Sequence, residues 1–198
     1  MAINVNDVTN RCVTTSTVGY MCLALTIWMV SMTNAAWYDR MYVQGSALIL
    51  PLAIVLGVMG ILAYFHGRSL DAVVFFGGTA LLWSAHAAGF GTVEIAREPT
   101  SYAGWYWALW TVFFGYVWLG SFKAGLARQF FLLGLCIALG ALALDEWTKL
   151  RVFELISGYV GLVTSAIALI VSASDVIKLG GEAHSPNDDR EAQHIHAT

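Results

Sequence analysis

Charged side chains are scarce in this chain of 198 residues, because Asp, Glu, Lys and Arg together make up only 12% of it. A soluble domain carries about 25%, so the composition argues against a soluble protein. The chain has no basic block and a formal net charge of −3, which argues against a nucleic-acid partner. It also lacks an HExxH motif and any recognisable pairing of nucleophile and base. The sequence therefore predicts that the protein is not an enzyme.

Metal ligands and redox ligands are scarce as well. The three cysteines, Cys12, Cys22 and Cys136, are scattered without the spacing of a metal site. A haem protein embedded in a membrane would need paired histidines within the membrane. Only His86 lies within an apolar stretch of this chain. The sequence therefore predicts no metal and no cofactor.

Apolar residues are abundant, at 58% of the chain. They form six continuous stretches, each close to the ~20 residues that a bilayer helix needs, and continuous stretches favour helices over a barrel. We therefore expect an all-α integral membrane protein, a bundle of six transmembrane helices. It would have an N-terminal tail at 1–16, a transmembrane domain at 17–176 and a polar, disordered C-terminal tail at 177–198. The expected spans are 17–36, 46–65, 70–90, 103–122, 128–144 and 153–175.

The Lys and Arg residues predict the orientation, because they are enriched in cytoplasmic loops. One side of the predicted topology carries six of them: Arg11, Arg68, Lys123, Arg128, Lys178 and Arg190. The other side carries four: Arg40, Arg97, Lys149 and Arg151. The bias places both termini in the cytoplasm. No stretch has the pattern of a cleaved signal peptide, which suits a multi-pass protein of a plasma membrane, such as a bacterial or archaeal inner membrane.

Polar side chains form stripes along the expected helices. Residues about two turns apart share a helix face, which aligns Thr26 with Thr33 and Thr79 with His86. Such stripes suit the passage of a small polar solute. The alternative is that each threonine hydroxyl bonds a carbonyl of its own helix. The candidate path residues are Thr26, Asn34, Thr79, His86, Gln129 and Ser165.

Ionisable side chains are almost absent from the middle of the spans. His86 is the exception and is a functional candidate by default, since an imidazole can exchange protons or bind an anion. The alternative is a neutral histidine that bonds to a neighbouring helix. Asp71 and Asp175 lie near the ends of their spans, where we expect them to be solvated at headgroup depth.

Several segments after Tyr64 share their residue order with a known family. They are Phe76 to Trp83; Gly104, Tyr106 and Trp110; Gly120 to Ala124; Arg128 to Leu135; and Gly158 to Val163. Together with the six spans, they resemble the acetate uptake transporter family, the succinate–acetate permeases of the YaaH type. The resemblance covers nearly all of the spans.

The amino end departs from that family. Its members open the first span with Asn-Pro-Ala-Pro-Leu-Gly-Leu, whereas the matching stretch here runs from Thr14 to Tyr20 and keeps only the glycine, Gly19. Thr26 and Asn34, farther along, match the family. The constriction of the relatives consists of an aromatic residue, a tyrosine and a leucine. The corresponding positions are Leu23, Thr79 and Leu135, of which only Leu135 is retained.

The resemblance implies a ring of six subunits, with one path through the bundle of each subunit and lipid in the central hole. We expect a membrane transporter or channel for acetate and similar small carboxylates, with proton coupling left open. One alternative is a channel for a small neutral solute, such as urea, an amide or ammonia. The other is an accessory or structural membrane subunit. The expected partners are the substrate, protons, the bilayer and further copies of the chain.

Overall fold

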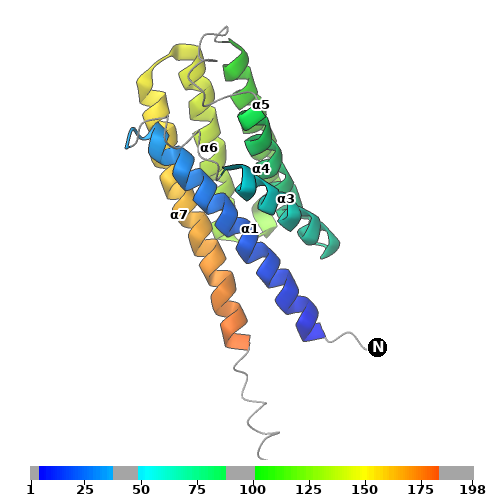
Figure 1. Ribbon diagram of the computed structural model, residues 1–198. Coiled ribbons are helices and arrows are strands. Elements are labelled where there is room, and N and C mark those ends of the chain that lie inside the picture. The colour runs from blue at the N-terminus through cyan, green and yellow to red at the C-terminus, as the bar shows by residue number, and fades with distance from the viewer. Residues whose placement is uncertain (1–4, 38–48, 88–100, 183–198) are drawn as a thin grey trace, which may run out of the picture.

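A computed structural model describes residues 5–37, 49–87 and 101–182 of the chain. These residues form six α-helices and one short 3-10 helix, and no strand occurs among them. Figure 1 shows the arrangement. The elements are α1 (Val5–Asn34), α3 (Ile49–Phe65), α4 (Ser69–Ala87), α5 (Ser101–Gly120), η2 (Ser121–Lys123), α6 (Leu126–Thr148) and α7 (Arg151–Glu182).

The helices confirm the expected all-α membrane bundle. Three segments are long and apolar enough to cross a membrane, namely Thr14–Asn34 in α1, the whole of α6, and Arg151–Ile177 in α7, while α3 is apolar but shorter. α1 and α7 extend beyond the expected spans. α7 continues to Glu182, so the expectation of a disordered tail is wrong for residues 177–182. The rest of that tail lies outside the described residues.

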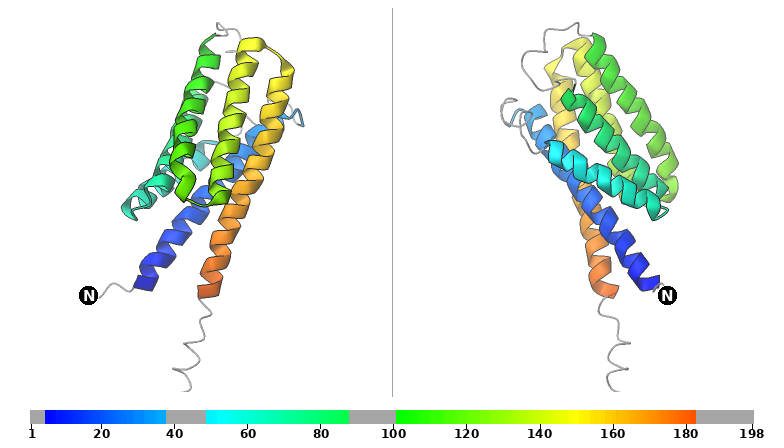
Figure 2. Two further views of the ribbon diagram at one scale, coloured as in Figure 1. Left: turned by 180° about the vertical axis from the view of Figure 1, so that it is seen from behind. Right: turned by 45° about the vertical axis from the view of Figure 1, so that its right-hand side comes forward.

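The first and last helices pack side by side along the bundle, although they are far apart in the sequence. Figure 2 shows α5, α6 and α7 adjacent on one face, and α3 and α4 crossing the bundle on the other. α1 begins and α7 ends at the same end of the bundle, which we call the terminal end. The turn between α3 and α4 and the turn between α5 and α6 face the same end, and α1 and α7 extend past them.

Small residues allow α1 and α7 to approach closely. A Cβ atom on Gly158 of α7 would lie 2.7 Å from the Cα of Ala35, just past the end of α1. One helical turn along α7, a Cβ on Gly161 would collide with the side chain of Ser31. Close approach through small residues drives helix association in lipid, where the hydrophobic effect between helices is lost. These two glycines therefore let the last turn of α1 pack directly against the first part of α7.

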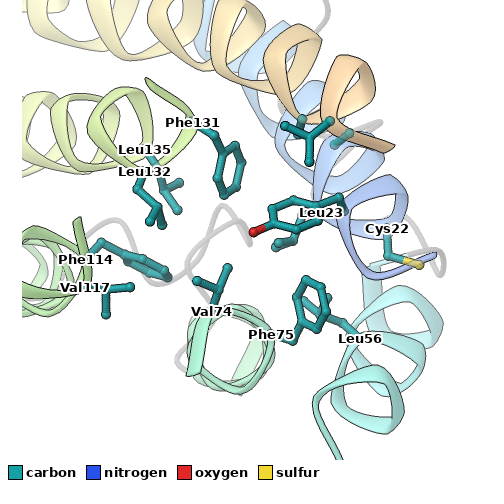
Figure 3. Close-up of a cluster of buried hydrophobic side chains, with 14 of the residues drawn as sticks. Cys22, Leu23, Leu56, Val74, Phe75, Phe114, Val117, Phe131, Leu132 and Leu135 are labelled. Carbon is teal, nitrogen blue, oxygen red and sulfur yellow. The ribbon is translucent and has the colours of Figure 1, made fainter. Parts of the chain in front are cut away.

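The interior of the bundle is filled by a cluster of buried apolar side chains from α1, α3, α4, α5, α6 and α7. In Figure 3, Leu23, Leu56, Val74, Phe114 and Leu135 converge on it from five of these helices. The outer faces of the helices expose large apolar side chains instead, as expected for a surface that meets lipid acyl chains. The cluster is therefore the place where any path through the bundle would be closed.

Candidate functional site

Three aromatic rings close the interior of the bundle towards the terminal end. Tyr20 of α1, Phe75 of α4 and Phe131 of α6 each have 0% of their surface exposed. The ring centroid of Tyr20 lies 5.4 Å from that of Phe75 and 5.6 Å from that of Phe131, in edge-to-face contacts. We call these three residues the aromatic plug. Edge-to-face contacts between aromatic rings add to the stability gained from burial, so the plug is a packed closure.

Two of the three residues expected at the constriction lie in the same buried cluster as the plug. Leu23 and Leu135 are both buried members of it, and Figure 3 shows them on opposite sides of the interior. Thr79 lies elsewhere, at the contact between α3 and α4, where its hydroxyl is 3.3 Å from the carbonyl oxygen of Ala53. Gly19 packs against the ring of Phe75, because only a residue without a side chain leaves room for that ring.

The hydroxyl groups of the predicted path donate hydrogen bonds to their own helices. Thr26 donates to the carbonyl of Cys22 at 2.8 Å, Thr79 to Phe75 at 2.9 Å and Ser165 to Leu162 at 2.7 Å. The alternative stated for the threonines is therefore confirmed for Thr26 and also for Thr33, whose hydroxyl donates to the carbonyl of Val30 at 2.6 Å. A hydroxyl that donates within its helix still offers its oxygen lone pairs to a solute.

The remaining candidates lie near the ends of their helices. Asn34 is buried at the last residue of α1, beside Gly158. Gln129 is half-buried near the start of α6, and its amide lies 3.5 Å from the carbonyl of Ser121. His86 is exposed near the end of α4. Asn34 and His86 thus lie near the C-terminal ends of α1 and α4, whereas Gln129 lies near the N-terminal end of α6.

The expectation that Asp71 and Asp175 are solvated is wrong. Their residues are only 2% and 6% exposed. An oxygen of Asp71 lies 2.7 Å from the guanidinium of Arg68, three residues earlier, and Arg128 of α6 lies 3.9 Å from Asp71 and 3.7 Å from Asp175. We call these four residues the ionic network. Buried charges need partners, and packing of α4, α6 and α7 supplies them.

Two residues of α1 join the ionic network to the aromatic plug. The hydroxyl of Tyr20 donates to Asp71 at 3.1 Å, and the ring of Tyr20 lies beneath Arg128, 5.6 Å from its guanidinium carbon. Ser16 accepts from Arg68 at 3.1 Å. Both lie in the stretch that departs from the Asn-Pro-Ala-Pro-Leu-Gly-Leu pattern. The residues that depart from the pattern and the charged residues at the terminal ends of α4, α6 and α7 together are the sequence signal that could have revealed the network.

Replacing Tyr20 with phenylalanine is expected to lower stability while it preserves the plug. The change removes one hydrogen bond to a buried carboxylate, worth about 1.5–3 kcal/mol, and keeps the ring. The midpoint of thermal unfolding in mild detergent should fall by several degrees. The control is Tyr159→Phe, because Tyr159 is 52% exposed on α7. Equal midpoints for the two variants would show that the bond to Asp71 contributes nothing.

Two other features do not contribute to this site. A shallow apolar groove on the outside of α5, α6 and α7 is lined by residues such as Val112, Ile137 and Leu144, whose side chains are exposed. It faces away from the interior. Across residues 5–37, 49–87 and 101–182, no group of three or more His, Cys, Asp or Glu side chains could hold a metal ion.

Comparison with known proteins shows a likeness to a solved structure. No protein-family model matches the sequence, and no curated protein matches it either. The fold is similar to that of a solved structure, the bacterial acetate channel SatP, with a TM-score of 0.72 and 19% sequence identity. The likeness covers 82% of this chain and 91% of that one. The chain therefore shares its fold with that channel over most of the length of both proteins.

Proposed function

We propose that this protein is a membrane channel or transporter for acetate and similar small carboxylates. The observation that carries the proposal is the shared fold with the acetate channel, which extends over 82% of this chain. The segment resemblance seen in the sequence supports the same assignment independently of the fold. The half-buried Arg128 at the terminal end adds a cationic group of the kind that a carboxylate needs.

The path is proposed to run through the interior of each subunit. It would pass the aromatic plug and then Leu23 and Leu135, which both belong to the buried cluster. Thr26, Asn34, Thr79, Gln129 and Ser165 would line it, with His86 at the mouth opposite the terminal end. The large apolar side chains on the outer faces would contact lipid and neighbouring copies, in a ring of six subunits.

The negative charge of the carboxylate limits how the solute can cross the apolar interior. A carboxyl group with a pKa of about 4.3 is almost wholly anionic at pH 7, and burying an unpaired charge in apolar surroundings is costly. The interior is closed by apolar and aromatic side chains. The anion can therefore cross only when the plug opens. Alternatively, the solute crosses as the neutral acid, that is, as the carboxylate with one bound proton.

Uptake of labelled acetate into proteoliposomes tests the proposal. Vesicles that contain the protein should accumulate acetate faster than empty vesicles, and the difference should be clearest at pH 7.5, because less neutral acid leaks through the lipid there than at pH 5.5. His86→Ala should lower uptake, because the histidine is proposed to lie at the mouth. No uptake above empty vesicles at either pH, by protein shown to be folded, would overturn the acetate assignment.

A channel for a neutral solute is the second candidate. The polar side chains proposed to line the middle of the path, Thr26, Thr79 and Ser165, carry no charge and offer hydroxyl oxygens only. Uptake of labelled urea without uptake of acetate would favour this candidate. Mass measurement in mild detergent tests the accessory-subunit alternative, since a uniform homo-oligomer argues against it.

A further inference from the structure

We propose that Arg128 is a binding site for the substrate carboxylate at the terminal end of the path, where a bound acetate takes the place of Asp175. This inference rests on the proposed function and identifies a residue that would hold the solute. The side chain of an aspartate ends in the same group as acetate, a carboxylate on a single carbon. Arg128 lies between Asp71 and Asp175, so its guanidinium can bind the carboxylate of acetate as it binds those of the aspartates.

The distances in the ionic network identify Arg128 as the available cation. Arg68 is committed, because it lies 2.7 Å from Asp71 and 3.1 Å from the hydroxyl of Ser16. Arg128 makes longer contacts, at 3.7 Å to Asp175, 3.9 Å to Asp71 and 3.5 Å to Ser16. A direct bond between a guanidinium and a carboxylate is about 2.7–2.9 Å long. Arg128 thus has N–H donors left for a closer partner.

Arg128 also lies directly in front of the aromatic plug, where a solute would bind before it enters the closed path. Its guanidinium lies over the ring of Tyr20, which forms the plug with Phe75 and Phe131. Its side chain is 22% exposed, whereas that of Asp175 is 9% exposed. A solute at the terminal end can therefore reach the guanidinium, and a solute bound there lies against the plug.

The charge balance explains why binding requires an exchange. Two arginines and two aspartates make the network neutral, so an added acetate would leave one uncompensated negative charge in a poorly hydrated place. Asp71 is held by both Arg68 and Tyr20. Asp175 lies 3.7 Å from Arg128 and is followed by the exposed residues Val176 and Ile177. Asp175 is therefore the carboxylate that gives way.

Binding of [13C]acetate to the purified protein, followed by saturation-transfer NMR, tests this exchange with two variants of opposite expected sign. Arg128→Gln should weaken acetate binding about tenfold or more, because a charge-assisted bond is lost. Asp175→Asn should strengthen it several-fold, because the competing carboxylate is gone. Arg151→Gln is the control, since Arg151 is an exposed arginine at the opposite end of α7.

The outcomes separate this inference from the proposed function. Unchanged binding by Arg128→Gln, or weaker binding by Asp175→Asn, would overturn the inference and leave acetate transport standing. If Arg128→Gln does not fold, the double variant Arg128→Gln/Asp175→Asn keeps the network neutral. Loss of acetate binding by that folded double variant supports the site, and retained binding overturns it. Failure of the unmodified protein to bind or transport acetate would overturn the proposed function itself.

Discussion

Replacing Gly158 with alanine is expected to destabilise the bundle strongly, although the change adds only one methyl group. The new Cβ would lie 2.7 Å from the Cα of Ala35, and backbone atoms cannot move aside as a flexible side chain can. Overpacking of this kind costs about 1–3 kcal/mol and occasionally more. We expect a cost at the upper end of that range, because α1 must move away from α7 along its length.

The midpoint of thermal unfolding and the monodispersity of the purified protein measure this effect. Gly120→Ala is the matched control, because no heavy atom lies within 4 Å of the position of its Cβ and alanine is a better helix former than glycine by about 1 kcal/mol. Gly161→Ala should lie between the two, since the side chain of Ser31 can rotate away. A Gly158→Ala protein as stable as the Gly120→Ala protein would refute the close contact.

Replacing Phe131 with alanine is expected to open the path at the aromatic plug. Phe131 is fully buried against Tyr20, so its truncation leaves a cavity next to the constriction. Acetate uptake should rise several-fold, and carboxylates longer than acetate should begin to enter. The same change should lower the free energy of unfolding by about 3–5 kcal/mol, as for other buried aromatic residues.

The neighbouring residue provides the control for this prediction. Phe130→Ala removes the same side chain one residue earlier in α6, but Phe130 is 57% exposed on the outer face. Uptake by that variant should match that of the unmodified protein. If Phe131→Ala folds and transports acetate at the original rate, with the original size limit, the path does not pass the plug.

The sequence predicted the architecture well because long apolar runs have few alternatives in a bilayer. Six runs near the length of a membrane span gave six helices, and short connections made neighbours antiparallel. The extent of α7 was underestimated, because a polar composition marks the end of an apolar span and does not mark the end of a helix. Residues 178–182 are helical although they follow the last apolar run.

The candidate site was predicted less well. The positions of Leu23 and Leu135 came from the family resemblance, and both lie in the buried cluster. The expectation for Asp71 and Asp175 is wrong, because a solvated carboxylate and a paired one can both lie near the end of a span. Asp71 has a local partner in Arg68, but Arg128, which lies near both aspartates, comes from another helix. No local sequence pattern indicates which helices will pack against one another.

The sequence by itself determined that this chain is a bundle of apolar helices with its charges at the ends of the spans. That follows from the cost of placing polar backbone and charged side chains in lipid. Only the tertiary structure decided that α1 packs along α7, that three rings close the interior, and that two arginines and two aspartates meet behind them. Those contacts depend on the shapes of helix faces far apart in the chain, and close packing selects among them only when all the helices are assembled.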